Sequence, residues 1–355
     1  MVEIFCQHDL VMKRPKKHSY EKYAFEASPW IQNLTQKKLA NLVGRKKQQL
    51  ESLIRDKNRY IKREQKLIGS KLRNLAVPTG KLREVHERLK FHLNKIKQPD
   101  YLYSPRKGRG QRDNATHHQA EVQFLSLDIR QFYPSTEDEH IFRWAHHVAG
   151  MRADVAGMFT KLVVIDKKMP FGSPLSPVLT THVHRDMFDE IYSICLVNDL
   201  KMSVWVDDLT ISGRSISREV LEQVRGVIRR KGFQTHKIKY RQSSRPVTVT
   251  GVPIIDGKIA ATFSLHQRIS RGYELLKDPQ LTDVERSNAI DALLGALGTY
   301  RYHVGPATAG GRKTSNRMQA LRDRRKKLDT KVIMLPIASA LPTDLNEDQS
   351  PLPWR

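Results

Sequence analysis

Three carboxylates have the types and spacing for cation-dependent chemistry. Asp128 lies near the end of an apolar segment, and Asp207 and Asp208 separate two short apolar runs. A sheet that places these segments side by side gathers three negative charges, which repel one another unless cations neutralise them. Two Mg²⁺ ions about 3.5–4 Å apart at such a site activate an attacking hydroxyl and stabilise a leaving pyrophosphate. The pattern therefore indicates nucleotidyl transfer, whereas an Asp-Asp pair in isolation is more often a solvated turn.

The segments that carry the carboxylates have the patterns of buried strands. Residues 122–129 predict one strand. Met202–Val206 and Leu209–Ser212 predict a hairpin whose turn is Asp207-Asp208. Hydrophobic periodicity and capping residues predict the other elements. These are a basic helix or helix pair over 35–67, a basic loop over 98–118, a helix capped by Thr136 and Glu139, a long helix from Ser176 and Pro177 through Tyr192, a helix over 217–230, strands over 247–250 and 259–263, a helix from Thr282 to about Tyr302, and a last basic helix over 312–329.

The charge of the chain favours a polyanionic partner. Its 355 residues include 62 Lys and Arg against 37 Asp and Glu, a formal net charge of +25. Such an excess supplies the counterion-release term of nucleic-acid binding, without distinguishing RNA from DNA. Cys6 and Cys195 are too few for a disulfide framework or a zinc cluster, which favours a reducing, cytoplasmic setting. We expect no membrane span, because the apolar stretch 332–342 is short and contains two prolines, and no signal peptide.

Three segments around the carboxylates resemble the palm motifs of reverse transcriptases. They are residues 124–135, 169–177 and 205–208, which read FLSLDIRQFYPS, MPFGSPLSP and WVDD. Upstream, residues 73–78 resemble the Arg-x-Ile-x-x-Pro segment of the fingers, so the match covers roughly 60–330. The resemblance implies an α+β fold: a right-hand polymerase with fingers, a ferredoxin-like palm and a helical thumb.

Two shorter motifs are similar to those that mark the retron reverse transcriptases of bacteria. Residues 114–118 fit Asn-Ala-x-x-His, and residues 249–251 fit Val-Thr-Gly. This resemblance implies an enzyme that copies a cognate structured noncoding RNA and primes from a 2′-hydroxyl of that RNA. The product is branched RNA–DNA (msDNA), and the family works in antiphage defence with a separate effector protein. His118 is equally well read as a hydrogen-bonded loop histidine, and Gly251 as a residue that permits a turn.

The resemblance also implies roles for individual residues. Asp128, Asp207 and Asp208, with the Ile129 carbonyl, correspond to ligands of two Mg²⁺ ions, Asp208 being secondary. Arg73, Tyr133, Phe171, Gly172 and Lys239 correspond to positions around the dNTP, with Tyr133 as steric gate and Lys237 competing with Lys239. RNA contacts are expected from Asn114, His118, Val249, Thr250, Gly251, Arg317, Arg324 and Arg325. Two residues depart from the family pattern: Phe171 replaces a glutamine, and Trp205 replaces a tyrosine.

The expected domains are an N-terminal extension (1–34), fingers with a basic RNA-contacting loop (35–120), a palm (121–255), a thumb (256–333) and a flexible tail (334–355). No ribonuclease H or effector domain is expected within the chain. Two alternatives stay open: a non-retron defence or intron-derived reverse transcriptase, and a catalytically idle RNA-binding scaffold. Branched priming distinguishes the first, and metal-dependent incorporation of dNTPs distinguishes the second.

Overall fold

A computed structural model describes residues 22–31, 33–68 and 71–333, in which helices and sheets are mixed. The chain divides into two compact units between Lys258 and Ile259. The predicted α+β class is confirmed. Most of the predicted N-terminal extension (1–34) and the whole predicted tail (334–355) lie outside the described residues. In the part of the chain that is described, no helix is both long and apolar enough to cross a membrane.

A five-stranded sheet lies at the centre of the first unit. The strand order is β3-β5-β6-β4-β7, with β3 parallel to β5 and the other neighbours antiparallel. Its strands are β3 (Leu102–Ser104), β4 (Gln123–Ile129), β5 (Lys201–Trp205), β6 (Asp208–Gly213) and β7 (Thr235–Gln242). Because side chains alternate between the two faces of a strand, Leu127 and Ile129 enter the core while Asp128 points to the opposite face.

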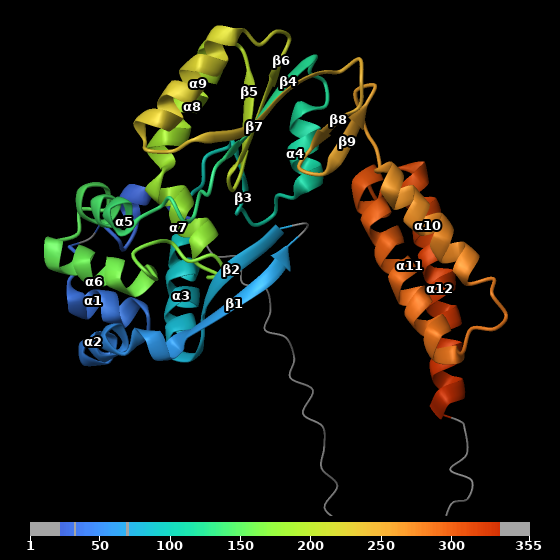
Figure 1. Ribbon diagram of the computed structural model, residues 1–355, viewed down its shortest axis with the longest axis horizontal. Coiled ribbons are helices and arrows are strands. Elements are labelled where there is room, and N and C mark those ends of the chain that lie inside the picture. The colour runs from blue at the N-terminus through green and yellow to red at the C-terminus, as the bar shows by residue number, and fades with distance from the viewer. Residues whose placement is uncertain (1–21, 32, 69–70, 334–355) are drawn as a thin grey trace, which may run out of the picture. The chain divides into compact units, whose positions relative to one another are not determined.

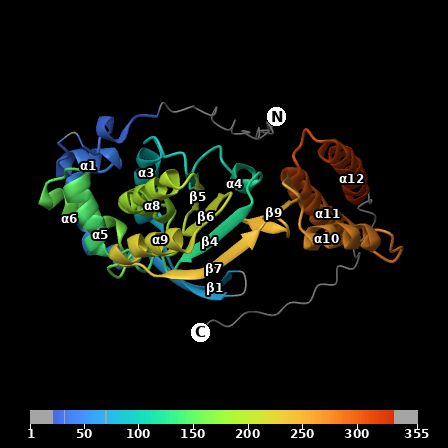
Figure 2. The same cartoon turned by 90° about the horizontal axis from the view of Figure 1, so that it is seen from above.

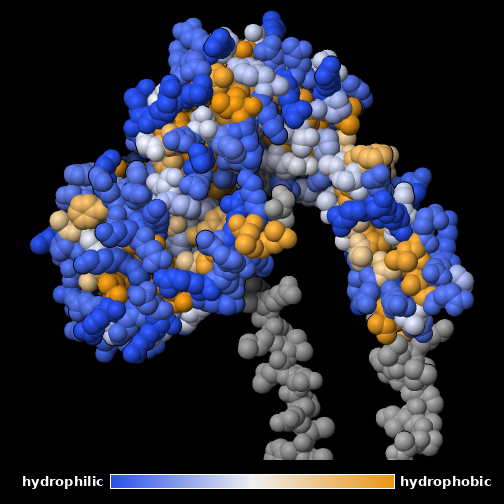
Figure 3. Space-filling view, in the orientation of Figure 1, coloured by the Kyte–Doolittle hydropathy of each residue, from blue (hydrophilic) through white to orange (hydrophobic). Residues whose placement is uncertain are grey.

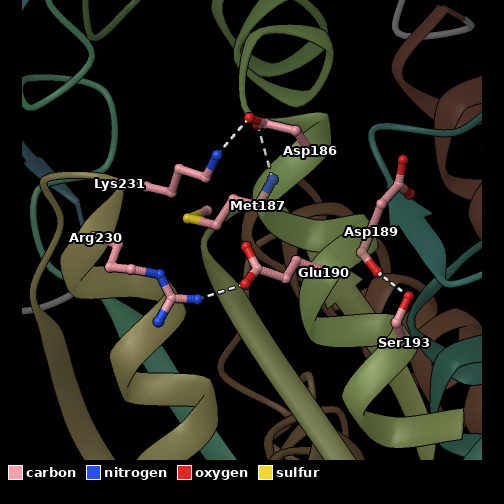
Figure 4. A network of polar contacts seen from close by, with 7 residues as sticks. All are labelled: Asp186, Met187, Asp189, Glu190, Ser193, Arg230 and Lys231. Atoms are coloured by element: carbon pink, nitrogen blue, oxygen red, sulfur yellow. Dashed lines mark hydrogen bonds and ion pairs between the residues drawn. The ribbon is translucent and has the colours of Figure 1, made fainter.

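Helices α8 (Arg185–Val197) and α9 (Arg218–Arg230) lie together against one face of this sheet (Figure 1, Figure 2). Their apolar stripes, including Phe188 and Val224, pack onto the buried side chains of β4, β5 and β6. Polar contacts fasten the two helices to each other at their outer edge. Lys231 Nζ donates to Asp186 at 2.6 Å, and Arg230 pairs with Glu190 (Figure 4). The face with Asp128 is left free of these helices.

A second core in the same unit is formed by helices before and after β4. Trp30, Leu89 and Phe159 are fully buried in it. The elements are η1 (Phe25–Ala27), α1 (Gln36–Leu42), α2 (Lys47–Arg55), η2 (Lys57–Tyr60), α3 (Gly80–Leu93), α5 (Asp138–Arg143), η3 (Trp144–Val148), α6 (Ala153–Val163) and α7 (Ser176–Val183). This core supports the segments on both sides of the strand that carries Asp128.

Two antiparallel hairpins extend from these cores. The strands β1 (Ile61–Ile68) and β2 (Lys71–Pro78) pair along their whole length. Leu67 and Leu72, near the end of this hairpin, are 66% and 64% exposed. The face seen in Figure 3 is otherwise mainly hydrophilic, with apolar residues in small separate patches. Helix α4 (Gln111–His118) packs against the second hairpin, β8 (Val247–Val249) and β9 (Val252–Ile255), which β10 (Lys258–Ile259) extends.

The second unit is a packed set of three helices, α10 (Phe263–Leu275), α11 (Asp283–Val304) and α12 (Ala309–Ile333). Thr282 and Glu285 form a reciprocal capping box at the start of α11, as predicted. Leu293 and Leu297 of α11 are almost wholly buried against α12 and α10. Of the strand predicted over 259–263 only Ile259 lies in a strand, β10, because Thr262 caps α10 and the helix begins at Phe263.

Several other expectations differ from the structure. The basic helical region ends at Arg55, and residues 61–68 form strand β1 because they pair with β2. The basic loop over 98–118 contains β3 and α4. Helix α5 is capped by Glu137 and not by Thr136. The long helix from Ser176 breaks at His184 into α7 and α8, and the hairpin turn is Val206-Asp207, since Asp208 already pairs with Trp205.

Candidate active site

The three predicted carboxylates lie at the same end of β4 and β6. Asp128 and Asp208 are directly opposite each other in the antiparallel pair of these strands. The backbone amide of Ile129 donates to the Asp207 carbonyl oxygen at 2.9 Å, which fixes the turn residue against β4. Directly opposed like charges destabilise a sheet unless something compensates them. The sheet therefore holds a repulsive pair in place, as expected of a site built to hold cations.

The turn that carries Asp207 has an unusual backbone. Val206 has φ of 63°, a left-handed conformation in which a β-branched residue is strained. A two-residue hairpin turn requires such angles, and the Val206 amide is also held by the Ser104 carbonyl at 3.0 Å. Strain of this kind persists only where the surrounding structure enforces it. Strand β3 thus helps to fix the position of Asp207.

Burial and mutual repulsion change the acidity of two of the carboxyls. Burial, followed by the charges of Asp208 and Asp128, raises the pKa of Asp207 to about 6. The pKa of Asp208 is also raised, by burial and then by Asp128, although Lys237 and Lys239 oppose this shift. Both shifts reflect burial first and the neighbouring carboxylates second, so the ionised forms are disfavoured. The oxygen ligands and the excess negative charge suit a hard divalent cation such as Mg²⁺.

A lysine contacts this cluster directly. Lys237 Nζ lies 2.9 Å from Asp128 Oδ2, and the lysine sits at a bulge in β7 with φ of 49°. Lys239, two residues further on, pairs in register with Ser126. Among the described residues, no group of three or more His, Cys, Asp or Glu is arranged to hold a metal ion. In this arrangement Lys237 compensates Asp128, so a cation that uses Asp128 must displace that ammonium group.

The residues expected around a nucleotide gather beside the carboxylates. Arg73 of β2 places its guanidinium carbon 4.9 Å from the centre of the Phe171 ring. The rings of Tyr133 and Phe171 are 5.8 Å apart. Tyr133 is half-buried, and burial, then the charge of Asp207, raises the pKa of its phenol. Arg73 in turn lowers the pKa of Asp207. These contacts connect the hairpin β1–β2 to the carboxylate turn through two aromatic rings.

The loop before α7 is fixed by close approach and by a buried histidine. The Ala76 amide donates to the Phe171 carbonyl at 2.9 Å, and Gly172 has φ of 122°. A Cβ at Gly172 would stand 2.9 Å from a methyl group of Val77, so glycine alone fits. His86 of α3 lies 2.7 Å from Ser173 Oγ, and burial lowers its pKa to about 4. Sequence reasoning missed His86, whose partners are distant along the chain.

The two short motifs that resemble those of retron reverse transcriptases contact each other. Asn114 Nδ2 of α4 donates to Thr250 Oγ1 at 3.4 Å, in the Thr250-Gly251 turn between β8 and β9. Thr250 and Gly251 have φ of 47° and 85°, as a two-residue hairpin turn requires. Val249, next to this turn, is buried. Asn114 Oδ1 is buried and has no hydrogen-bond partner among the described residues. The two motifs therefore form one structural unit.

His118 is fully buried beneath the sheet. Its ring nitrogens lie 2.6 Å from Ser212 Oγ and 2.8 Å from Ser203 Oγ, on β6 and β5. Burial lowers the pKa of His118 well below its ordinary value, so the ring is neutral. Asn114 is equally inaccessible. A direct contact of these two side chains with RNA is thus inconsistent with the structure, because neither reaches solvent, and any role they have in RNA binding is indirect.

The basic residues expected on the last helix have different surroundings. Arg317 and Arg324 of α12 are exposed. Arg325 is half-buried, donates to Ser287 Oγ at 3.2 Å and pairs with Asp291 of α11. Arg325 therefore holds α12 to α11. The basic pattern of the sequence had suggested only an RNA contact.

A mainly antiparallel sheet that presents carboxylates at a hairpin turn, backed by two helices on its other face, is the arrangement expected of the palm of a nucleic-acid polymerase. The family model for reverse transcriptase (RNA-dependent DNA polymerase) matches residues 56–254, more than half of the chain. The chain therefore belongs to the reverse transcriptase family.

Three curated relatives confirm the predicted resemblance to retron enzymes. The chain is 24% identical over 232 residues to the retron Se72 reverse transcriptase of Salmonella heidelberg, covering 62% of this chain and 61% of that protein. It is 27% identical over 264 residues to the retron Ec83 reverse transcriptase of Escherichia coli, covering 66% of this chain and 80% of that protein. It is 24% identical over 158 residues to the retron Ec86 reverse transcriptase of Escherichia coli, covering 44% of this chain and 49% of that protein. The chain thus spans less than two thirds of the length of two of these relatives.

Proposed function

We propose that this protein is a retron-type RNA-directed DNA polymerase. It copies its cognate structured noncoding RNA into DNA, starting from a 2′-hydroxyl of that RNA, and leaves branched RNA–DNA. The observation that carries the proposal is the carboxylate turn of β4 and β6 next to Arg73, Tyr133 and Phe171, in a chain whose relatives are retron reverse transcriptases. We place the reaction in the bacterial cytoplasm, in antiphage defence with a separate effector protein.

In this proposal Asp128, Asp207 and Asp208, with the Ile129 carbonyl, would hold two Mg²⁺ ions. When bound, these ions neutralise charge on the reacting phosphates and on the attacking hydroxyl. The raised pKa values of Asp207 and Asp208 support this role, because a nearby cation would stabilise the ionised form of both carboxyls. Lys237 leaves Asp128 as the site fills and, with Lys239, stands near the departing phosphates.

The neighbouring side chains orient the nucleotide. Arg73 donates from its guanidinium to the triphosphate, a planar fork that suits phosphate oxygens. Tyr133 lies under the sugar and excludes a 2′-hydroxyl, which selects deoxynucleotides. Phe171, at the position where the family has glutamine, supports the Arg73 guanidinium by a cation–π contact in place of a hydrogen bond. Gly172 lets the loop backbone approach β2.

The remaining parts act on the RNA. We assign residues 35–120 to fingers with an RNA-contacting segment, 121–255 to the palm and 256–333 to a thumb. Thr250 and Gly251 contact the cognate RNA at the β8–β9 turn, and Arg317 and Arg324 contact the template–primer. Asn114, His118, Val249 and Arg325 act by positioning these surfaces, since they are buried or tied to a neighbouring helix.

The experiment is expression of the protein with its flanking genomic DNA, followed by extraction of small nucleic acids. A short DNA that shifts on debranching treatment, and is lost in Asp207→Asn and Asp208→Asn variants, supports the proposal. Carboxylate-dependent DNA without a branch favours a non-retron reverse transcriptase. If the purified protein also incorporates no dNTP on any primed template, an idle RNA-binding scaffold is favoured.

A further inference from the structure

A groove separate from the carboxylates lies along α3. It has a volume of about 800 Å³ and is bounded by α3, the segment after β3 and the start of α7. We call it the α3 groove. Its lining residues are Lys22, Glu87, Lys90, Phe91, Asn94, Lys95, Gln98, Pro105, Arg106, Lys107, Pro174, Pro177 and Val178. The catalytic aspartates and the residues expected around the nucleotide are not among them.

Charge in the α3 groove is strongly one-sided. Five of its described lining residues are Lys or Arg, against one carboxylate, Glu87. That carboxylate is already paired with Lys90 at 2.7 Å. Arg106 donates to the Pro99 carbonyl at 2.9 Å, which restrains its guanidinium. Lys22 and Lys107 are exposed and form no ion pair or hydrogen bond within the described part of the chain. The groove therefore favours a polyanion.

The floor of the α3 groove is apolar and aromatic. Phe91 is half-buried with Lys95 Nζ 4.6 Å from its ring centre, and three prolines and Val178 continue the apolar surface. Two side-chain amides, Asn94 and Gln98, stand among the cations. Phosphate-binding cations around an aromatic floor are the features that bind single-stranded nucleic acid, whose unstacked bases lie on rings. Amides beside them suit the donor and acceptor properties of a 2′-hydroxyl.

We propose that the α3 groove binds a single-stranded segment of RNA, with a base against Phe91 and phosphates near Lys22, Lys95 and Lys107. The choice of RNA rests on the proposed function, in which the template and the primer are RNA. The charge and the aromatic floor are independent of that function. An acidic peptide would use the cations and leave Phe91 and the amides without a role, so RNA is favoured.

The test is binding of a fluorescent single-stranded RNA of about eight nucleotides to the full-length protein. A saturating RNA–DNA template–primer is present throughout, so that the polymerase cleft does not contribute. The test variant is the double substitution Lys22→Glu and Lys107→Glu. The matched control is Arg218→Glu with Arg229→Glu on α9, which makes the same change of charge at exposed positions elsewhere. Phe91→Leu is measured separately, by cross-linking of a thiouridine-containing RNA.

We expect the groove variant to bind RNA at least about tenfold more weakly at about 0.1 M salt, with a salt dependence reduced by about two phosphate contacts. The control variant keeps the wild-type Kd, and Phe91→Leu loses the cross-link to the α3 peptide. An unchanged Kd, or an equal loss in the control, overturns the proposal. It is also overturned if polyglutamate binding, and not RNA binding, is lost in the groove variant.

Extension of oligo(dT) on poly(rA) by the same proteins separates this proposal from the proposed function. We expect the wild type to extend this generic substrate, which tests the polymerase cleft independently of the groove. If the wild type extends no primer, the polymerase proposal fails while the RNA-binding measurement still decides the role of the groove.

Discussion

Replacing Asp207 with asparagine is expected to stabilise the metal-free protein while removing its proposed activity. The pKa of Asp207 is about 6 in the folded chain against an ordinary value of 3.8. One pKa unit corresponds to 1.36 kcal/mol, so the ionised carboxylate costs the folded state up to about 3 kcal/mol above pH 6. Asp207 is only half-buried, and screening by water reduces the effect to about 1–2 kcal/mol.

The sign of the pH dependence follows from the direction of the shift. Between about pH 4 and 6 the folded chain holds a proton on Asp207 that the unfolded chain releases. The contribution of Asp207 to wild-type stability therefore falls as the pH rises through this window and is constant above it. The Asp207→Asn variant has no such carboxyl, so its advantage develops between pH 4 and 6 and is complete at pH 8.

The assay is urea denaturation in EDTA at pH 4.5 and pH 8, followed by tryptophan fluorescence. Glu26→Gln, which removes one exposed carboxylate of the same unit, is the control and is expected to change little. Added Mg²⁺ at one hundred times its Kd reverses the order, because a cation that binds only the folded wild type then stabilises it by about 2.7 kcal/mol. Equal stability of wild type and Asp207→Asn at pH 8, or a difference that is the same at both pH values, refutes the reasoning.

Three further predictions concern Lys237, the buried His118 and the proposed steric gate Tyr133. Lys237→Met should tighten Mn²⁺ binding about two- to fivefold in calorimetry, because no ammonium then has to leave Asp128; an equal gain in Lys239→Met would attribute the effect to net charge alone. His118→Ala should lower the free energy of unfolding by about 2–4 kcal/mol, since two hydrogen bonds and buried volume are lost; a loss below 1 kcal/mol in urea denaturation would contradict this. Tyr133→Ala should raise the incorporation of ribonucleotides relative to deoxynucleotides at least about tenfold in primer extension, and an unchanged ratio would remove the gate role.

Elements with strong local signals could be predicted from the sequence. The strand that carries Asp128 and the helix capped by Thr282 match the structure closely, because apolar patterning and capping are local. Strand β1 was not foreseen, since six of its eight residues are exposed and its conformation depends on pairing with β2. The break at His184 was missed for a similar reason. The apolar period continues through it, while its ring packs on Phe233 at 4.8 Å.

The candidate site was likewise predictable where the signal is local and not where it depends on contacts between distant residues. The hairpin pattern was sufficient to place Asp207 and Asp208 at one turn, because strands that flank a tight turn are neighbours. The pairing of β4 with β6, which brings Asp128 to them, was expected only from the resemblance to reverse transcriptases. The ion pair between Lys237 and Asp128 and the hydrogen bonds of His86 and His118 were not predictable, since each joins residues more than seventy positions apart. Their side chains are specified by three-dimensional packing and leave no periodic pattern.

The contact between Asn114 and Thr250 has a consequence for how this protein can vary. The two residues are 136 positions apart, yet a change at one alters the surroundings of the other. Substitutions at these two positions should therefore covary among relatives. A chimera that takes α4 from one relative should also take the β8–β9 turn from the same relative. Exchanging either segment alone would join two surfaces that were never selected to fit each other.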